Sequence, residues 1–595
     1  MSGISGIVYK NQKAEYKDIK AMNDLIIHRG PDGEGFYLDD FLALGHRRLI
    51  VSDLSDEAAQ PMYYKDLVIV FDGRIYNAAE LRDELSNLGY TFKTDCETEV
   101  LLAAYDCWGQ SSVYKLNGMW SFAIYDKKNQ ILFCSRDRFG TRPFYYTSLG
   151  DKFIFGSEIK QLLQFMPYRI ADKAILADFL VCGFTNHTDK TFFKNIYCLM
   201  GGYNLIFDLK KHSFKIYQYY FVDNTTPKKI SIEDFKKVFF QAVKTDFPSN
   251  VKVGSCLSGG LDSSSVVAAI SDLTKKNNKK DFVCIHAKST ENRTDESNYA
   301  KLVAESKNID LKLIKPSLED FINSIDEVCY IQEEPFLGLS IFMQYFVMKE
   351  AKKNNCKVLF DGQGSDGLFG NSYYYVLGLL SLPFYSALKS LIKYIKSTKL
   401  QILRLIVCCI YFSSFPLLNL RQRLKYSFLK SEYLPNFEWN KKKARAFSSI
   451  IELQLLELYN TCLPALMRYD DKNSMWHSIE TRFPFLDKRL LETILGLEDD
   501  YKVHDGWIKY ILRKALENDL PKEVVWRKSK FGFYAPEKSW LSGIHSIMIK
   551  GIESNKILKK MFKYNVNLEK LDNLVLWRLF SISKWIDIFS VTDIS

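Results

Sequence analysis

The stretch SCLSGGLDSSSVVAAI, residues 255–270, decides the fold of the larger half of this chain. It joins the end of an apolar strand to a Gly-Gly turn and then to an apolar run with helical spacing. The two glycines let the backbone approach a ligand closely, and the N–H groups at a helix start favour an anion. We therefore predict a strand–turn–helix unit that binds a pyrophosphate. The alternative is an ordinary strand-to-helix turn, since Gly-Gly turns are common.

The residues that follow the turn favour the phosphate interpretation. Asp262 stands at the helix start, where a carboxylate can hold Mg²⁺ against phosphate oxygens. Ser263 and Ser264 add hydroxyl groups beside it. The sequence thus predicts a site for a pyrophosphate group and its metal ion.

The sequence around this loop alternates between strand and helix patterns. We predict a strand over 251–257, a helix over 262–274 and a strand over 281–287, and VLFDG (358–362) follows a helix that ends near residue 355. Such alternation predicts a parallel sheet with crossover helices. The rest of the C-terminal half has mostly helical patterns.

A second glycine-rich turn, LFDGQGSDGLFG, spans residues 359–370. It follows a buried strand and carries Asp366, and open α/β sheets bind ligands at the carboxyl ends of their strands. Asp262 and Asp366 would then share one metal ion. The alternative is a surface aspartate in a glycine-rich turn.

The first 220 residues have a different pattern, with short alternating or continuous apolar runs that predict strands. Helices are predicted at 77–87 and 97–108. The polar stretch VDNTTPKKIS, residues 222–231, suits a linker. We divide the chain into a β-rich domain, a linker and a second domain at residues 1–220, 221–231 and 232–595.

Length and composition fit a folded protein of two or three domains, with 595 residues, 47% hydrophobic and 25% charged. The start lacks the pattern of a secretion signal, and no apolar run reaches 18 residues. The 12 cysteines form no CxxC pair and no zinc pattern. We expect reduced thiols, a cytoplasmic protein and no membrane span.

The net charge of +11 is concentrated in one segment. Residues 386–445, in a basic and apolar insert over about 372–445, contain 13 Lys and Arg against Glu432 and Glu438. Such composition fits a helical subdomain or a membrane surface better than base recognition. We expect no nucleic acid partner. Packing of the run Leu403–Leu418 against the core is favoured, and contact with the inner face of a membrane stays open.

SGGLDSS resembles the PP-loop of ATP pyrophosphatases, and the wider sequence resembles asparagine synthetases of the B type over nearly the whole chain. The matching N-terminal motifs are HRGPDG, LGHRRL, AQPM, SFAIYD, CSRDRFGTRPFYY and GSEIKQLL. The matching C-terminal motifs are SIETRFPFLD, KYILRKAL and WRKSKFGF. The resemblance implies an Ntn-hydrolase-like, class II glutamine amidotransferase sandwich (α+β) followed by a PP-loop α/β domain with helical additions.

The same resemblance implies an amide ligase that uses ATP and Mg²⁺, adenylates a carboxylate and releases pyrophosphate. The resemblance does not decide whether the protein forms a homodimer. Asp262 and Asp366 would bind the metal. The ATP-binding residues would be Leu257, Ser258, Gly259, Gly260, Leu261, Asp262, Ser263, Ser264, Ile285, Asp361 and Gly362.

Three further positions carry family roles by resemblance. Lys530 would neutralise the adenylate phosphate and the developing oxyanion, a role that needs a fixed positive charge. Glu333, with Glu334 and Pro335, would meet the incoming amine. The family reads Gly-Glu-Gly-Ser-Asp-Glu in the second loop, where this chain has Gln363 and Gly367. A carboxylate that would help the amide-forming step is therefore absent.

The glutaminase half departs further from the family. Its nucleophile would be the cysteine exposed after removal of the first methionine, and here position 2 is Ser2. Asn-Gly-Glu becomes Asp72-Gly73-Arg74, so an ionised carboxylate replaces an oxyanion donor worth roughly 3 kcal/mol. Arg48 still fits the glutamine carboxylate, and Glu97 replaces the usual Asp. We expect the pocket shape to persist without its chemistry.

Three functions compete. The first is an adenylating amide ligase without its own glutaminase, similar to β-lactam synthetases, lasso-peptide cyclases or the sugar-acid amidating proteins of polysaccharide gene sets. Its substrates would be a small-molecule, sugar-acid or peptide carboxylate and an amine or ammonia. The second is a glutamine-dependent asparagine synthetase or sugar-acid amidotransferase working through Ser2. The third is a scaffold or binding pseudoenzyme.

Overall fold

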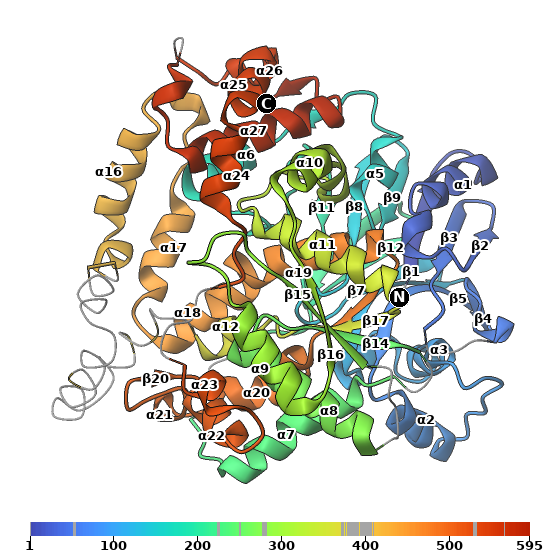
Figure 1. The fold of residues 1–595 in the computed structure, drawn as a ribbon. Helices are drawn as coiled ribbons and strands as arrows, with labels where there is room; N and C mark the ends of the chain where they lie inside the picture. The colour runs from blue at the N-terminus through green and yellow to red at the C-terminus, as the bar shows by residue number, and fades with distance from the viewer. Residues whose placement is uncertain are drawn as a thin grey trace.

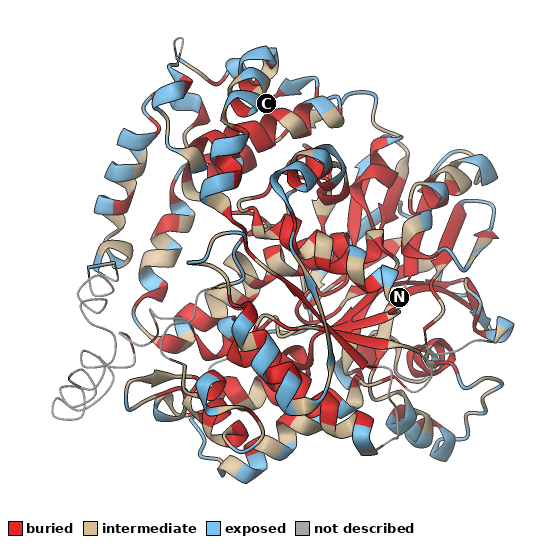
Figure 2. Ribbon diagram, in the orientation of Figure 1, coloured by how far each residue is buried: buried red, intermediate tan, exposed pale blue. Residues whose placement is uncertain are grey.

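The computed structural model describes residues 2–51, 55–222, 227–248, 251–276, 282–370, 374, 377, 392, 407–408, 410–527, 532–563 and 566–595. Figure 1 places the N-terminal half on one side and the helices of the C-terminal half around a second, central sheet. Figure 2 shows that the strands of both halves are mostly buried.

Two six-stranded antiparallel sheets form the N-terminal half. Their order is β11-β8-β9-β1-β3-β2 in the first and β13-β12-β7-β6-β5-β4 in the second. The strands are β1 (Ser2–Tyr9), β2 (Gly33–Leu38), β3 (Leu42–Arg48), β4 (Met62–Tyr64), β5 (Leu67–Ile75), β6 (Gly118–Asp126), β7 (Ile131–Arg136), β8 (Tyr145–Leu149), β9 (Lys152–Gly156), β11 (Tyr197–Cys198), β12 (Tyr203–Asp208) and β13 (Ser213–Gln218).

One apolar layer lies between the two sheets, because alternate residues of each strand face inward. Ile4 and Val8 of β1 meet Val68 and Val70 of β5 in that layer. Helices α1 (Tyr16–Asp24) and α5 (Ile159–Leu163) contact the first sheet, while α3 (Glu97–Trp108) contacts β5 of the second, with α2 (Ala78–Asn87) packed on α3. The predicted β-rich sandwich is confirmed, and α2 and α3 begin within one residue of their predicted starts.

A five-stranded parallel sheet forms the centre of the C-terminal half, in the order β16-β15-β14-β17-β18. The chain builds β14, β15 and β16 outward on one side and then returns to add β17 and β18 on the other. The direction therefore reverses between β14 and β17, and ligands bind at such a switch point. The strands are β14 (Val253–Cys256), β15 (Phe282–Ala287), β16 (Asp310–Ile314), β17 (Val358–Phe360) and β18 (Glu480–Arg482).

Helices cover both faces of this sheet. Alternate residues of the strands belong to two apolar clusters, one with α7 (Ile232–Thr245), α8 (Leu261–Lys276) and α9 (Ser297–Lys307), the other with α10 (Leu318–Gln332) and α11 (Ser340–Lys353). The later helices include α12 (Ser365–Phe369), α16 (Phe415–Lys425), α17 (Glu438–Ala446), α18 (Ile450–Leu456), α19 (Leu463–Trp476), α20 (Lys488–Leu495), α22 (Tyr510–Leu516), α24 (Glu537–Gly543), α25 (His545–Ser554) and α27 (Asn573–Ile588).

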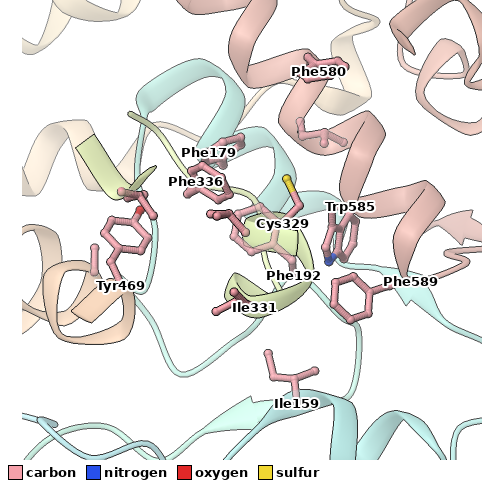
Figure 3. Packing of buried hydrophobic residues seen from close by; sticks show 14 of the residues in the cluster. Ile159, Phe179, Phe192, Cys329, Ile331, Phe336, Tyr469, Phe580, Trp585 and Phe589 are labelled. Carbon is pink, nitrogen blue, oxygen red and sulfur yellow. The ribbon is translucent and has the colours of Figure 1, made fainter. Parts of the chain in front are cut away.

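The two halves share one continuous hydrophobic cluster. Figure 3 shows Ile159, Phe179 and Phe192 of the first half packed with Phe336 and Trp585 of the second. The chain end also returns to the first half, where β21 (Asp593–Ile594) pairs with β10 (Ile170–Ala171). Because apolar area is buried across the boundary, the halves form one packed body. The predicted linker lies partly outside the described residues.

The basic and apolar insert is only partly described. The predicted packed run ends in Leu417 and Leu418, which lie on α16. Leu418 is buried, as packing against the core requires, whereas Leu417 is 53% exposed, so the packing prediction is wrong for Leu417. Leu420 and Leu424 of the same helix are also exposed, at 55% and 66%. Residues 378–391, 393–406 and 409 lie outside the described part of the chain. Among the helices that the structure describes, none is long and apolar enough to cross a bilayer.

Candidate active site

The phosphate loop connects β14 to α8 and is held by its own side chains. Ser258 N donates to Ser263 Oγ (3.1 Å), and Gly260 N donates to Ser258 Oγ (3.2 Å). Gly259 has a φ of +80°, and a Cβ there would lie 2.7 Å from Ala300 N. Backbone conformation and close packing therefore both require glycine at this position.

The second loop packs directly on the first. A Cβ at Gly362 would lie 2.8 Å from Ser263 N and 2.9 Å from the carbonyl carbon of Asp262. This contact brings the start of α8 against the end of β17. The two loops meet at the switch point of the sheet, at the carboxyl ends of β14 and β17.

A cavity opens where the loops meet. Of the predicted ATP-binding residues, Leu257, Ser258, Asp262, Ser263, Ile285, Asp361 and Gly362 line it. Gly259, Gly260, Leu261 and Ser264 are not among its lining residues; Leu261 and Ser264 are buried beneath the loop. The lining residues that sequence reasoning missed are Cys256, His286, Gln344, Val347, Gly532 and Phe533.

The two predicted metal ligands lie together, bridged by a lysine. Lys509 Nζ contacts Asp262 Oδ1 at 2.6 Å and Asp366 Oδ1 at 2.5 Å. Ser365 Oγ also donates to Asp262 Oδ1 at 2.7 Å. Lys509 is the first residue of the KYILRKAL motif, but no local pattern in the sequence signals that it enters this cavity.

His286 and Asp361 set the polarity of the cavity. Nδ1 of His286 lies 2.8 Å from the Leu257 carbonyl, which can only accept, so Nδ1 carries the proton and Nε2 is an acceptor. Burial lowers the pKa of His286, and its Nε2 has no hydrogen-bond partner among the described residues. Burial raises the pKa of Asp361 to about 6.

A second pocket lies around Ser2 in the N-terminal half. It is lined by Ser2, Arg48, Gly73 and Glu97 of the predicted glutaminase set, whereas Asp72 is fully buried beneath it. Asp72 Oδ1 accepts from Ser2 N at 2.8 Å, and Asp72 Oδ2 accepts from Arg29 Nη2 at 3.0 Å. Both carboxylate oxygens are thus engaged, and neither can donate to an oxyanion.

Glu97 in this pocket already has partners from the replaced loop. Its Oε2 accepts from Ile75 N at 2.8 Å, and its Oε1 lies 3.5 Å from Arg74 Nη1. The coulombic attraction of Glu97 raises the pKa of Arg74, which stays charged. The acid that would pair with a substrate ammonium is therefore neutralised by the protein itself.

Two family models match this chain, the glutamine amidotransferase domain over residues 1–220 and asparagine synthase over residues 234–575. The chain belongs to the asparagine synthetase family. Asparagine synthetase [glutamine-hydrolyzing] 1 of Bacillus subtilis is 31% identical over 91% of this chain and 88% of its own length. Putative asparagine synthetase [glutamine-hydrolyzing] 2 of Methanocaldococcus jannaschii is 36% identical over 62% of this chain and 75% of its own length.

Membership makes this asparagine synthetase family member a carbon–nitrogen ligase that forms an amide through an AMP-activated intermediate. The cavity between the two glycine-rich loops lies in the asparagine synthase domain, and the pocket around Ser2 lies in the amidotransferase domain. The predicted family and two-domain fold class are confirmed.

Mg²⁺ fits the chemistry of the synthase cavity. Asp262, Asp366 and the Ser365 hydroxyl offer hard oxygen donors, and Mg²⁺ in such sites takes one or two carboxylates plus substrate phosphates. Within the described ranges no cluster of three or more His, Cys, Asp or Glu could hold a metal. The protein donors here would therefore need the oxygens of ATP to complete the coordination.

Glu333 and Glu334 lie in the contact between the two domains. Both are buried, and neither lines the synthase cavity. Glu333 accepts from Ile159 N (2.9 Å) and Lys160 N (2.8 Å) and pairs with Lys472, while Glu334 accepts from Phe192 N (2.9 Å). These carboxylates join the two domains, and the role of Glu333 towards the amine stays a prediction.

Gln363 and Lys530 are the other two residues predicted to be catalytic. Gln363 lines the cavity, and its N–H donates to Asp361 Oδ1 at 3.0 Å. Lys530 lies outside the described residues. The assigned role of each stays a prediction.

Glu457 is a carboxylate that sequence reasoning missed. It begins a short π-helix, Glu457–Thr461, and its Oε2 accepts from Tyr374 Oη at 3.0 Å. Burial raises the pKa of Glu457 to about 7, with Asp366 adding to the rise. A carboxyl that titrates near neutral pH thus stands beside the loop whose usual glutamates are replaced.

A chain of buried ion pairs runs from the residue beneath the Ser2 pocket to β18 of the synthase domain. Arg29 Nη1 contacts Asp471 Oδ2 at 2.7 Å, and Asp471 Oδ1 contacts Arg142 Nη1 at 3.1 Å. Arg142 Nη2 donates to the Thr481 carbonyl of β18 at 2.9 Å. Because Asp72 also pairs with Arg29, the altered glutaminase residue now belongs to the contact between the domains.

Proposed function

We propose that this enzyme adenylates a carboxylate with ATP, condenses it with an amine or ammonia, and does not hydrolyse glutamine itself. The observation that carries the proposal is the contrast between its two pockets. The synthase cavity keeps its glycine-rich loops and both acidic residues. The Ser2 pocket has a buried Asp72 in place of an amide donor and an Arg74 paired with its acid.

The first chemical step would use the geometry of the synthase cavity. The substrate carboxylate attacks the α-phosphorus of ATP, the bond to the β-phosphate oxygen breaks, and pyrophosphate leaves. Backbone N–H groups at the start of α8 would hold the phosphates, since a helix N-terminus favours anions. Bound Mg²⁺ would supply charge neutralisation at the phosphate oxygens.

The cavity also suits the adenine ring. Leu257 and Ile285 provide apolar walls, and His286 lies beside them in the lining. His286→Phe should weaken ATP binding while leaving pyrophosphate binding close to that of the wild type. This difference would separate adenine recognition from phosphate recognition.

In the second step the amine attacks the acyl carbon and AMP leaves. The attacking nitrogen must lose a proton, and Gln363 and Gly367 cannot accept it as the family glutamates would. Glu457, whose pKa burial raises to about 7, does not line the cavity, so the proton would pass to the departing AMP phosphate. The carboxylate substrate would be a small molecule, a sugar acid or a peptide.

Exchange of labelled pyrophosphate into ATP, measured across a panel of carboxylic acids, tests the proposal. Exchange that requires one acid identifies the substrate class. Asp262→Asn and Asp366→Asn should each reduce this exchange by orders of magnitude, because ATP cleavage would lose a metal ligand. Near-normal exchange in both variants would show that the metal ligands are wrong.

A glutamine-dependent synthetase working through Ser2 is the second candidate. Ser2 lines a pocket with Arg48 and Glu97, and the relatives of this chain are named glutamine-hydrolyzing. Release of glutamate from glutamine above the rate without enzyme would favour this candidate.

A further inference from the structure

Lys509 occupies the space between the two proposed metal ligands. Its Nζ lies 2.6 Å from Asp262 Oδ1, 2.5 Å from Asp366 Oδ1 and 3.4 Å from Ser365 Oγ. The lysine is 2% exposed, whereas the side chain of Asp366 is 60% exposed. A buried ammonium therefore joins a buried carboxylate to one that faces the open cavity.

The backbone around Lys509 holds the side chain in place. Lys509 has a φ of +58°, a conformation rarely adopted outside glycine, and it directly precedes helix α22. Next to it, the Ile508 carbonyl accepts from Arg513 Nε at 2.8 Å. A strained backbone at a site like this is commonly retained for a functional placement.

The ammonium changes what the two carboxylates can bind. Without it, the pair would carry two negative charges and attract a divalent cation from solution. With it, part of this negative charge is offset, and a cation between the carboxylates would stand next to the positive Nζ. The phosphates of ATP remove this conflict, because their oxygens can accept from the ammonium and bind the cation as well.

We propose that Lys509 is an internal counter-ion that prevents a divalent cation from binding to Asp262 and Asp366 alone, so that the cation enters only together with the nucleotide. The inference rests on the proposed use of Mg²⁺ and ATP in this cavity. It assigns Lys509 two successive sets of partners, the carboxylates before ATP binds and the phosphates afterwards.

The proposal is tested by measuring how tightly the full chain binds Mn²⁺ without nucleotide. Electron paramagnetic resonance measures this binding, because the signal of free Mn²⁺ is lost when the ion binds. We expect weak binding by the wild type and about tenfold or tighter binding by Lys509→Met, since one repulsive charge is removed. Lys509→Arg keeps the charge and should resemble the wild type. Lys514→Met removes a half-buried positive charge from helix α22, which Lys509 precedes, and should also resemble the wild type.

Thermal unfolding shows whether the Lys509→Met variant is folded. Lys509→Met leaves the two carboxylates without their ammonium, so it should unfold at a lower temperature than the wild type. Mn²⁺ alone should raise its unfolding temperature and leave that of the wild type unchanged. Adding Asp366→Asn to Lys509→Met should abolish both the new Mn²⁺ site and this recovery.

Two results would overturn the inference. One is Mn²⁺ binding by the nucleotide-free wild type that is as tight as that of Lys509→Met. The other is a folded Lys509→Met that gains no Mn²⁺ affinity. Mn²⁺ added with α,β-methylene-ATP separates the inference from the proposed function. If the wild type binds Mn²⁺ with the analogue, the proposed metal use stands even when the counter-ion role fails; if it does not, both fail.

Discussion

Under the proposed function, Asp72 has a structural role in place of a catalytic one. It cannot donate to an oxyanion, yet it accepts from Ser2 N and pairs with Arg29 inside the contact between the domains. Burial raises the pKa of Asp72 while Arg29 opposes the rise. Its replacement should therefore affect stability more than glutamine hydrolysis.

We predict that Ser2→Cys combined with Asp72→Asn restores little glutamine hydrolysis, because Arg74 still neutralises Glu97. Asp72→Ala should also reduce the free energy of unfolding by roughly 3 kcal/mol, since Arg29 and the Ser2 N–H each lose a buried partner. Glutamate release and urea unfolding measure the two effects. Substantial hydrolysis by the double variant would show that Arg74 is compatible with glutamine binding.

Glu457 should make stability depend on pH. Its pKa is raised from 4.5 to about 7 in the folded protein. Below pH 4.5 Glu457 holds its proton in both the folded and the unfolded state. Between pH 4.5 and 7 the unfolded state loses the proton first, which favours unfolding. The free energy of unfolding therefore falls as the pH rises, by up to about 3 kcal/mol.

Glu457→Gln should therefore be more stable than the wild type at pH 8, and the gain should shrink towards zero as the pH falls to about 4.5. Urea unfolding across this pH range checks the sign. Glu452→Gln replaces an exposed carboxylate on the preceding helix and should show no such slope. A gain for Glu457→Gln that does not change with pH would contradict the prediction.

At the scale of elements, the contact between the two glycine-rich loops controls the synthase cavity. Gly362→Ala would place a Cβ 2.8 Å from Ser263 N, so the loops must separate, and we expect at least tenfold weaker ATP binding. Gly367→Ala on the same loop would meet its nearest atom, Leu458 Cδ2, at 3.9 Å and should be tolerated. Calorimetric titration with ATP compares the two. Equal affinities would show that this loop contact is not needed.

Helix α16 carries the testable part of the membrane hypothesis. Leu417, Leu420 and Leu424 are exposed on a helix that also contains Arg421 and Arg423. Apolar and basic residues together favour an anionic bilayer surface, at about 1 kcal/mol for each basic residue near it. We predict co-sedimentation with anionic vesicles at low salt and release at high salt.

Changing the three exposed leucines to glutamine should abolish this vesicle binding. Leu88→Gln alters an exposed leucine at the end of α2 and serves as the matched control. Binding that persists in the triple variant would remove α16 from the interaction. The absence of salt-sensitive binding by the wild type would remove the membrane hypothesis.

At the scale of the whole molecule, the sequence predicts what depends on local pattern. The strand, turn and helix around Ser258 follow from apolar spacing and glycine, and β15 and α8 begin within one residue of their predicted starts. Proximity across the sheet could also be inferred for Asp262 and Asp366, because parallel strands align their carboxyl ends.

Contacts between segments that are distant in the sequence could not be predicted from local patterns. Lys509 reaches Asp262 across 247 residues, and Arg29 reaches Asp471 across 442. Glu333 resembles a substrate residue in sequence but is buried between the domains, because its partners Ile159 and Lys472 come from other elements. Such assignments depend on tertiary packing, which motif spacing does not encode.

The packing between the two halves gives the amidotransferase domain a structural role that does not depend on glutamine hydrolysis. The ion pairs from Asp72 to Arg142 and the shared apolar cluster hold it against β18 and α19. We infer that it supports the synthase domain structurally, which explains why its fold would persist after its chemistry is lost.

The most direct test follows two products in one reaction. The full-length enzyme, ATP, Mg²⁺, glutamine and the panel of carboxylic acids are incubated together, and pyrophosphate exchange and glutamate release are measured on the same sample. We predict exchange that depends on one class of acid, with glutamate release no faster than without enzyme. Glutamate release that rises with enzyme concentration, or no exchange with any acid, would contradict an adenylating amide ligase that lacks its own glutaminase.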